Sequence, residues 1–114
     1  MNEGRLSGKV AIITGASTGL GPLMARMFVD QGARVLLAAR REELVQAAAQ
    51  ACGSAAIAVR ADVTNEADVT GMVARAVEEF GQVDVLCNNA AVPGKDSFIW
   101  ERTDYRQLER HFRG

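Results

Sequence analysis

The 114-residue sequence predicts an α/β fold built on a doubly wound parallel sheet, and three observations lead to it. Four short apolar runs alternate with three segments of helical periodicity, which is typical of strands buried on both faces of a parallel sheet. A glycine-rich turn joins the first strand to the first helix. The connections are short, and right-handed crossovers in such a series give about four strands in the order 3-2-1-4.

The first strand and the first helix flank the glycine-rich turn. Residues 9–14 form an apolar run that predicts the strand, and the helix is expected to begin near residues 19–21. Pro22 suits the first turn of a helix because its missing N–H needs no partner there, and Gly32 is expected to end the helix. Helical spacing predicts a buried stripe on this helix made of Leu20, Met24, Met27 and Phe28.

The second and third strands are predicted at residues 34–39 and 55–59, on either side of an alanine-rich helix over 42–52. Gly53 is expected to end that helix. Glutamates stand in its first turn, where the helix dipole favours negative charge. The third strand has the weaker β propensity because three of its five residues are alanine.

A third helix and a fourth strand complete the regular pattern. Thr64 is expected to cap this helix, Gly81 to end it, and residues 83–87 to form the strand. Farther along the chain the pattern weakens, with a loop expected over 93–96 and a short helix over 103–112. Helical spacing predicts that the buried face of the third helix comprises Val69, Met72, Val73, Ala76, Val77 and Phe80.

The composition predicts a folded protein that binds neither nucleic acid nor membrane. The net charge is −1 and the basic residues are spread along the chain, so no surface is set up to attract a polyanion. No apolar run approaches the roughly 20 residues of a membrane span, and none matches a signal peptide. Cys52 and Cys87 are expected to be free thiols in a reducing cytoplasm. Neither they nor the single histidine, His111, have the spacing of metal ligands.

The turn over residues 14–21 reads Thr-Gly-Ala-Ser-Thr-Gly-Leu-Gly and carries the strongest functional indication. A glycine-rich turn at a helix N-terminus presents backbone N–H groups to a diphosphate, which the helix dipole also attracts. In a Rossmann-type fold, Gly15 would allow the tight turn, Gly19 the close approach of the phosphate and Gly21 the close packing of the helix. A turn that serves only chain reversal is the alternative. The predicted dinucleotide contacts in this turn are Gly15, Ser17, Thr18, Gly19, Leu20 and Gly21.

Taken with this turn, three further matches make the chain resemble the N-terminal half of a short-chain dehydrogenase/reductase. They lie at compatible spacing at the ends of the second, third and fourth strands: Ala39-Arg40-Arg41, Asp62-Val63 and Asn88-Asn89-Ala90-Ala91. The resemblance covers roughly residues 5–92 and is faint beyond Pro93. It implies a dinucleotide-binding Rossmann half-domain over 1–92, a divergent tail over 93–114, and a partial, truncated form of the family's sheet.

The resemblance implies that the cofactor is NADP rather than NAD. In the family, an acidic residue at the end of the second strand binds the ribose 2′-hydroxyl of NAD. This chain has Ala39 there, followed by two arginines. The resemblance therefore implies that Arg40 contacts the 2′-phosphate of NADP and that Arg41 assists it. The alternative is that both arginines are only solvated at a strand end.

The resemblance also assigns the ends of the third and fourth strands. Asp62 and Val63 match the positions that bracket the adenine, whose exocyclic amine would donate to the carboxylate. Asn89 and the backbone of Ala90 match positions near the cofactor ribose. Two alternatives stay open: Asp62 helps to end the strand and start the helix, and Asn88 ties neighbouring strands together.

No catalytic residue is assigned. The family transfers a hydride between the nicotinamide and an alcohol or carbonyl, with a Tyr-x-x-x-Lys pair, a serine and an asparagine. The only tyrosine, Tyr105, is followed four positions later by Glu109 instead of lysine, so we interpret Tyr105 as a packing residue. General acid–base catalysis supplies about 10²–10⁴ in rate, and we therefore expect the chain alone to show no dehydrogenase activity.

Three hypotheses for the function remain open. The chain is the cofactor-binding half of an NADP-dependent dehydrogenase, or a non-catalytic NADP(H)-binding module that pairs with a full-length relative, or a nonfunctional remnant. We also expect the fourth strand to be left as an open edge of the sheet. Unpaired backbone groups on an edge strand favour pairing with another chain, so self-association is expected there.

Overall fold

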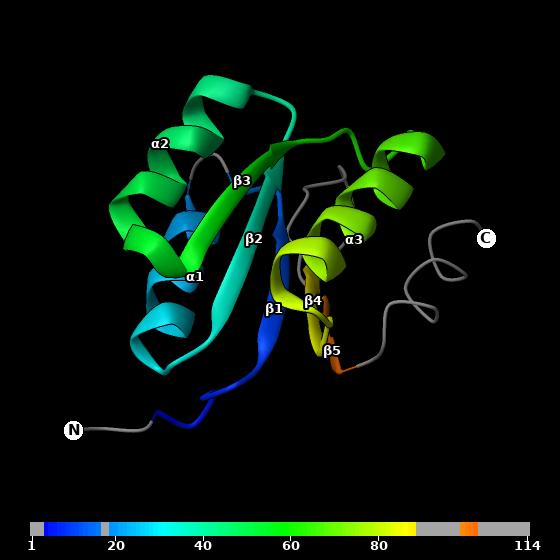
Figure 1. Ribbon diagram of the computed structural model, residues 1–114. Helices are drawn as coiled ribbons and strands as arrows, with labels where there is room; N and C mark the ends of the chain where they lie inside the picture. Colours follow the sequence, from blue (N-terminus) through cyan, green and yellow to red (C-terminus); the bar gives the residue numbers. More distant parts are fainter. Residues whose placement is uncertain (1–3, 17–18, 89–98, 103–114) are drawn as a thin grey trace.

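The computed structural model describes residues 4–16, 19–88 and 99–102 and shows an α/β fold (Figure 1). Its sheet has five strands in the order β3-β2-β1-β4-β5. The pairs among the first four strands are parallel, as the sequence predicts, and β5 is antiparallel to β4. The strands are β1 (Val10–Thr14), β2 (Arg34–Ala39), β3 (Ala56–Arg60), β4 (Val85–Asn88) and β5 (Ile99–Arg102).

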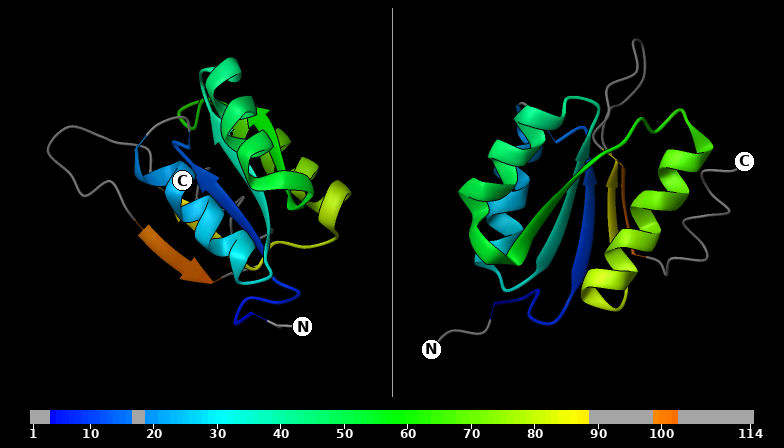
Figure 2. Two further views of the ribbon diagram at one scale, coloured as in Figure 1. Left: turned by 90° about the vertical axis from the view of Figure 1, so that its left-hand side faces the viewer. Right: turned by 45° about the horizontal axis from the view of Figure 1, so that its top comes forward.

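Helices cover both faces of the sheet (Figure 2). The helices α1 (Leu20–Asp30) and α2 (Glu42–Cys52) lie on one face, and α3 (Glu66–Phe80) lies on the other. A short 3-10 helix, η1 (Gly53–Ala55), joins α2 to β3. This arrangement confirms the predicted doubly wound sheet with parallel strands in the order 3-2-1-4. Among the described residues, no helix combines the length and the apolar character needed to cross a bilayer.

The hydrophobic core consists of two layers, one on each face of the sheet. Alternate residues of a strand point to opposite faces, so Ala11 and Ile13 of β1 belong to the layer under α1 and α2. Ile12 belongs to the layer under α3. Two residues predicted for the buried face of α3, Val77 and Phe80, are only half-buried. The buried residues of α3 are Val69, Met72, Val73 and Ala76, as predicted.

The buried stripe of α1 differs in part from the predicted one. Met24 and Phe28 are buried as predicted, but Leu20 and Met27 are 50% and 57% exposed. At 100° per residue, Leu20 and Met27 lie about 90–110° from the centre of the stripe that faces the sheet. They therefore belong to the flanks of the helix, where the sheet does not reach them.

The start of α3 also differs from the prediction. Its N-cap is Asn65, not Thr64, because the Asn65 Oδ1 accepts a hydrogen bond from the backbone N–H of Asp68 at 3.0 Å. The Thr64 hydroxyl instead donates to the carboxylate of Asp62, two residues earlier in the chain, at 2.6 Å. Gly81 ends the helix as predicted, with a left-handed φ of +88°.

The prediction that β4 forms an open edge is wrong. β5 pairs with β4, with Asn88 opposite Ile99 and Val85 opposite Arg102. This pairing supplies partners for backbone groups of β4 that would otherwise face solvent. The sequence pattern missed β5 because four residues are too few to establish a period of two. The predicted loop over 93–96 and helix over 103–112 lie outside the described residues.

Candidate dinucleotide-binding site

The carboxyl ends of β1 to β4 meet at one edge of the sheet. Thr14 of β1 lies opposite Ala38 of β2 and Asn88 of β4, and Ala39 lies opposite Arg60 of β3. The described residues that follow β1, β2 and β3 therefore leave the sheet at one end, the upper end in the right-hand view of Figure 2. They include the predicted cofactor contacts Gly15, Arg40 and Asp62. In doubly wound sheets, ligands bind at this edge where the strand order reverses, here between β1 and β4.

The glycine-rich turn after β1 depends on backbone angles that glycine adopts readily. Gly15 and Gly19 have φ values of +64° and +69°, in the left-handed region that L side chains rarely adopt. The Ala16 N–H still donates to the Ala38 carbonyl oxygen at 3.2 Å, so the turn begins directly at the end of β1. A Cβ added at Gly19 would meet no atom within 4 Å, which leaves the backbone there open to approach.

Gly21 brings the first turn of α1 against this loop. A Cβ added at Gly21 would lie 2.6 Å from the Cα of Ala16 and 2.9 Å from the carbonyl oxygen of Gly15. Both neighbours are backbone atoms, which cannot move aside as the end of a flexible side chain can. Only glycine therefore lets the helix begin this close to the end of β1.

The N-terminus of α1 has the chemistry of an anion site. Its cap position, Gly19, makes no side-chain hydrogen bond, and the first turn contains no acidic residue. The first N–H groups of a helix have no partner within the helix, and the helix dipole adds partial positive charge there. These backbone groups, which include that of Leu20, are suited to hold a diphosphate.

Two arginines follow β2 at the same edge. Ala39 is buried at the end of the strand, whereas Arg40 and Arg41 are exposed. In the part of the chain that the structure describes, neither guanidinium forms an ion pair. Glu42 and Glu43 lie in the first turn of α2 and offset part of this positive charge. Within the described residues, the strand end thus offers two guanidinium groups without an ion-pair partner, and position 39 carries no carboxylate.

Asp62 follows β3 and is held as a charged acceptor. Its Oδ1 accepts hydrogen bonds from the Thr64 hydroxyl at 2.6 Å and from the Thr64 N–H at 2.9 Å. The hydroxyl bond, followed by the N–H bond, lowers the pKa of Asp62 from its ordinary value, and the charges of Arg40 and Arg60 lower it further. At neutral pH this side chain is therefore an ionised acceptor. Val63 is half-buried against the core layer under α3.

The structure adds Asp68 and Arg60 to this end of the site, and the sequence analysis missed both. The Asp68 Oδ2 accepts from the backbone N–H of Asp62 at 2.9 Å and from the Nη1 of Arg60 at 3.0 Å. One signal could have indicated Asp68. It lies three residues after the N-cap Asn65, a position from which side chains reach back to earlier backbone N–H groups.

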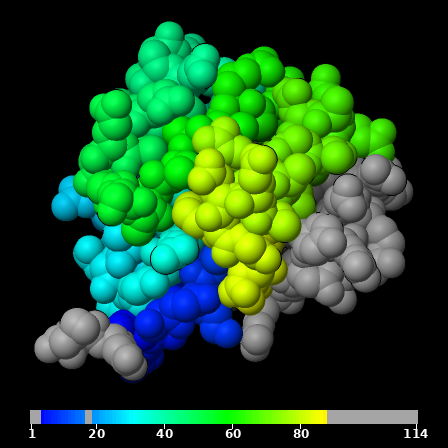
Figure 3. All heavy atoms as spheres, in the orientation of Figure 1, coloured from blue at the N-terminus to red at the C-terminus, as the bar shows by residue number. Residues whose placement is uncertain are grey.

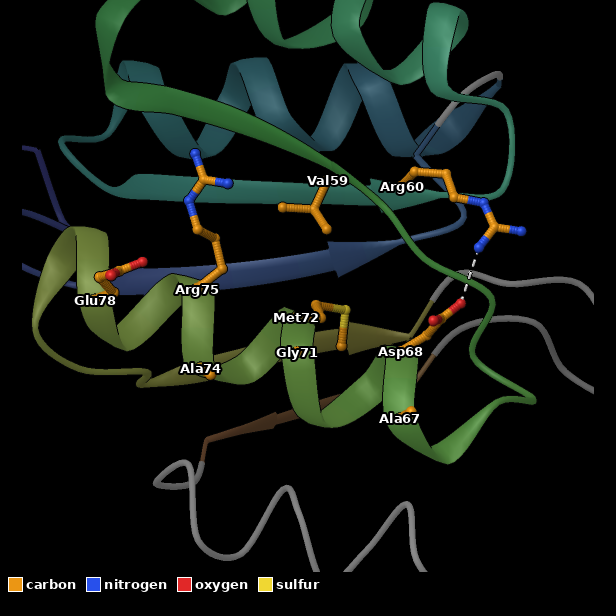
Figure 4. Close-up of a pocket in the computed structure, with 9 residues that line it drawn as sticks. All are labelled: Val59, Arg60, Ala67, Asp68, Gly71, Met72, Ala74, Arg75 and Glu78. Carbon is orange, nitrogen blue, oxygen red and sulfur yellow. Dashed lines mark hydrogen bonds and ion pairs between the residues drawn. The ribbon is translucent and has the colours of Figure 1, made fainter.

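A groove of about 500 Å³ between β3 and α3 ends at this ion pair (Figure 4). Val59 of β3 and Met72 of α3 line its middle, and Arg75 lies farther along α3. No residue of the glycine-rich turn lines it. The groove is therefore separate from the predicted diphosphate site and meets the predicted adenine end only through Arg60 and Asp68.

Several residues named from the sequence cannot be placed at the site. Asn88 is described through its backbone, which pairs with Thr14 of β1 and with Ile99 of β5. Among the described residues, no group of three or more His, Cys, Asp or Glu side chains is arranged to hold a metal ion. The residues that lie outside the described part of the chain are Ser17, Thr18, Asn89, Ala90, Tyr105 and His111.

Similarity to known proteins decides the family. A sequence model described as short chain dehydrogenase matches residues 9–112. The chain belongs to the short-chain dehydrogenase family. Momilactone A synthase from Oryza sativa subsp. japonica is 43% identical over 107 residues, which are 93% of this chain and 39% of that protein. Short-chain dehydrogenase reductase 3a from Arabidopsis thaliana is 46% identical over 89 residues, 77% of this chain and 35% of that protein.

This short-chain dehydrogenase chain also matches a solved structure. The crystal structure of 3-ketoacyl-(acyl-carrier-protein) reductase from Brucella melitensis, complexed with NADH, matches it with a TM-score of 0.75 at 46% sequence identity. The match covers 76% of this chain and 36% of that chain. This chain thus spans less than half the length of the relatives named here.

The family uses nicotinamide cofactors, and its fold binds dinucleotides. Two observations on this chain fit such a ligand. The backbone at Gly19 is open to approach, and the close packing at Gly21 places the N-terminus of α1 directly behind it. The positions after β2 and β3 add two guanidinium groups and an ionised carboxylate at the same edge.

Proposed function

We propose that the chain is the cofactor-binding half of an NADP(H)-dependent short-chain dehydrogenase/reductase. The whole protein transfers a hydride between the nicotinamide and an alcohol or carbonyl substrate, and the cofactor supplies that hydride chemistry. The observation that carries the proposal is that the glycine-rich turn after β1 and the pair Arg40 and Arg41 after β2 share one edge of the sheet. Backbone N–H groups bind the diphosphate, and guanidinium groups bind the adenosine 2′-phosphate.

The end of β2 favours NADP over NAD in this proposal. Ala39 offers no carboxylate to accept a hydrogen bond from the 2′-hydroxyl of NAD, and none is there to repel a 2′-phosphate. Arg40 is exposed and has no ion-pair partner in the described part of the chain. A hydrogen bond between charged groups contributes about 1.5–3 kcal/mol, which corresponds to roughly one to two decades of affinity.

A binding titration tests this function. We expect the purified chain to bind NADPH about 10- to 100-fold more tightly than NADH. Adenosine 2′,5′-bisphosphate and adenosine 5′-monophosphate differ only in the 2′-phosphate, so titration with each isolates the contribution of this group to the affinity. The bisphosphate should bind more tightly by the same factor. Equal affinities for NADPH and NADH would contradict the NADP assignment, and no binding of either would contradict the dinucleotide site.

A non-catalytic NADP(H)-binding module that pairs with a full-length relative is the second candidate. In this candidate the chain binds the cofactor and the relative supplies the tyrosine–lysine pair, since the only tyrosine of the given sequence, Tyr105, is followed four positions later by Glu109. Co-purification of the chain with such a relative, together with NADPH binding, would support this candidate. A nonfunctional remnant is the third reading, and it requires that no dinucleotide binds.

The chain alone is expected to show no dehydrogenase activity. Without the tyrosine–lysine pair it lacks the general acid–base step, which contributes about 10²–10⁴ in rate. The measurement follows NADPH consumption in the presence of a panel of ketones and aldehydes. Sustained oxidation that scales with the concentration of the chain would contradict the prediction.

Self-association through a strand edge is proposed for β3, since β4 is covered by β5. The Ala61 N–H donates to the Ala39 carbonyl oxygen at 2.9 Å. Val59 lies two residues earlier, so its backbone N–H and C=O groups also point toward β2. Because alternate residues of a strand turn their backbone groups to opposite sides, those of Ala58 and Arg60 face outward. Figure 3 shows the green atoms of this strand at the surface between α2 and α3.

The substitution Ala58→Pro tests this edge. It removes an outward N–H without removing a bond to β2, so we expect folding to persist and self-association to fall at least about tenfold. Ala58→Val is the matched control, because it keeps the N–H and should associate like the unsubstituted chain. Light scattering over a concentration series measures both. Equal association of the proline variant would place the interface elsewhere, with the outer edge of β5 as the next position to test.

A reducing compartment such as the cytoplasm is proposed from the two cysteines. Both Cys52 and Cys87 are free thiols. Burial raises the pKa of Cys87 to about 12 and is also the main cause of the raised pKa of Cys52. The thiols are therefore protonated at neutral pH and not prone to oxidation, which suits a chain that relies on no disulfide.

A further inference from the structure

The carboxylate of Asp68 links several parts of the turn between β3 and α3. Its Oδ2 accepts from the backbone N–H of Asp62 at 2.9 Å and from the Nη1 of Arg60 at 3.0 Å. The N–H of Asp68 donates to the Oδ1 of Asn65 at 3.0 Å. The side chain of Asp68 is 26% exposed, and its bond from the Asp62 N–H is part-buried, so this bond is partly shielded from water. Asp68 thus ties the end of β3 to the first turn of α3 (Figure 4).

These bonds determine how the carboxylate of Asp62 is presented. Asp68 holds the backbone of Asp62, and Thr64 holds its Oδ1 through two hydrogen bonds. In the described part of the chain, the second oxygen of Asp62 makes no hydrogen bond. With the backbone and one oxygen held, the other oxygen has a defined direction and is available to accept a bond from a ligand.

We propose that Asp68 is a positioning residue that makes the site selective for adenine over purines that lack an exocyclic amine. The inference rests on the proposed function and on the contact that the family resemblance implies, in which Asp62 accepts a hydrogen bond from the adenine amine. A hypoxanthine base has a carbonyl oxygen at that position, which cannot donate to a carboxylate. The discrimination therefore depends on where the unbonded oxygen of Asp62 points, and Asp68 holds that direction.

Asp68 also restrains the guanidinium of Arg60. The charge of Arg60 lies close enough to Asp62 to lower the pKa of its carboxylate, so the two side chains attract each other. While Asp68 binds Arg60 at 3.0 Å, the guanidinium is kept on the α3 side of the turn. Without Asp68, Arg60 would pair with the unbonded oxygen of Asp62 and compete with the adenine amine. Both effects of Asp68 act on base selectivity and leave the diphosphate contacts unchanged.

The test compares NADPH with its hypoxanthine analogue, in which the amine of the base is replaced by a carbonyl oxygen. For the unsubstituted chain we expect NADPH to bind about 10- to 100-fold more tightly than the analogue. Asp68→Ala should weaken NADPH binding about tenfold or more and leave the analogue within about threefold, so that the preference largely disappears. Asp68→Asn keeps an acceptor for the Asp62 N–H but loses the charge that holds Arg60, and it should give an intermediate preference.

Glu79→Gln is the matched control. It breaks the other ion pair of α3, between Arg75 and Glu79 at 3.1 Å, and should leave both affinities unchanged. Thermal unfolding of each variant shows that the titrated protein is folded. The inference would be overturned if Asp68→Ala weakened the binding of NADPH and of its analogue equally. If the alanine variant does not fold, the same result for Asp68→Asn would overturn it. So would the absence of a base preference in the unsubstituted chain. Binding of neither nucleotide by that chain would refute the proposed function as well.

Discussion

Replacing Gly21 with alanine is expected to abolish measurable NADPH binding and to destabilise the chain. The new Cβ would lie 2.6 Å from the Cα of Ala16 and 2.9 Å from the carbonyl oxygen of Gly15, so α1 or the turn must move. Overpacking of this kind costs about 1–3 kcal/mol, and the shift misplaces the N–H groups that hold the diphosphate. Thermal unfolding and NADPH titration measure the two effects separately.

Gly71→Ala is the control for this substitution. Gly71 also lies in a helix, α3, but a Cβ added there would meet no atom within 4 Å. The change should stabilise the helix by about 0.5–1 kcal/mol, because alanine loses less backbone entropy than glycine on folding. NADPH affinity should stay the same. A Gly21→Ala variant that binds NADPH as tightly as the Gly71→Ala variant would refute the role given to the close packing of α1.

The double substitution Ala39→Asp with Arg40→Ala is expected to turn the preference from NADP to NAD. It removes the guanidinium that binds the 2′-phosphate and introduces a carboxylate that accepts from the 2′-hydroxyl of NAD and repels the phosphate. Each charged contact contributes about 1.5–3 kcal/mol, so the ratio of the two affinities should change by at least about 10²-fold. Titration of the variant with NADPH and NADH gives the ratio directly.

Arg34→Ala is the matched control for the arginine substitution. Arg34 is exposed at the start of β2, whereas Arg40 directly follows the other end of that strand, at the predicted site. Its removal takes away one positive charge, as Arg40→Ala does, and should leave the ratio of affinities unchanged. If both variants keep the original ratio, the 2′-phosphate does not bind at the end of β2.

Sequence patterns predicted most of the sheet but not its outer pairing. The four parallel strands were found because strands buried on both faces are continuous apolar runs, bounded by glycine and by helical periodicity. β5 was missed because it has four residues and its position depends on the partner it meets, β4. The exposure of Leu20 and Met27 was missed because helical spacing gives the direction of a stripe and not the width of the surface that covers it.

The candidate site was predicted in the same uneven way. The spacing of the motif predicted a tight turn at Gly15 and close packing at Gly21, and the structure has a positive φ at Gly15 and crowded packing at Gly21. Asp68 was missed because its role depends on the path of the turn after β3, which brings the Asp62 N–H and the Arg60 guanidinium to one oxygen. The change of N-cap from Thr64 to Asn65 has a similar origin, because the Thr64 hydroxyl is bonded to the carboxylate of Asp62 and Asn65 accepts the Asp68 N–H instead.

Local sequence patterns were enough to predict the order of the parallel strands and the position of the glycine-rich turn. Burial periodicity and the left-handed φ that glycine favours are local properties, and short crossovers then leave few arrangements open. The partner of β4, the uncovered flanks of α1 and the bonds made by Asp68 were settled only in the folded chain. Each of these depends on how separate segments approach one another in space, and the spacing of residues along the chain does not contain that information.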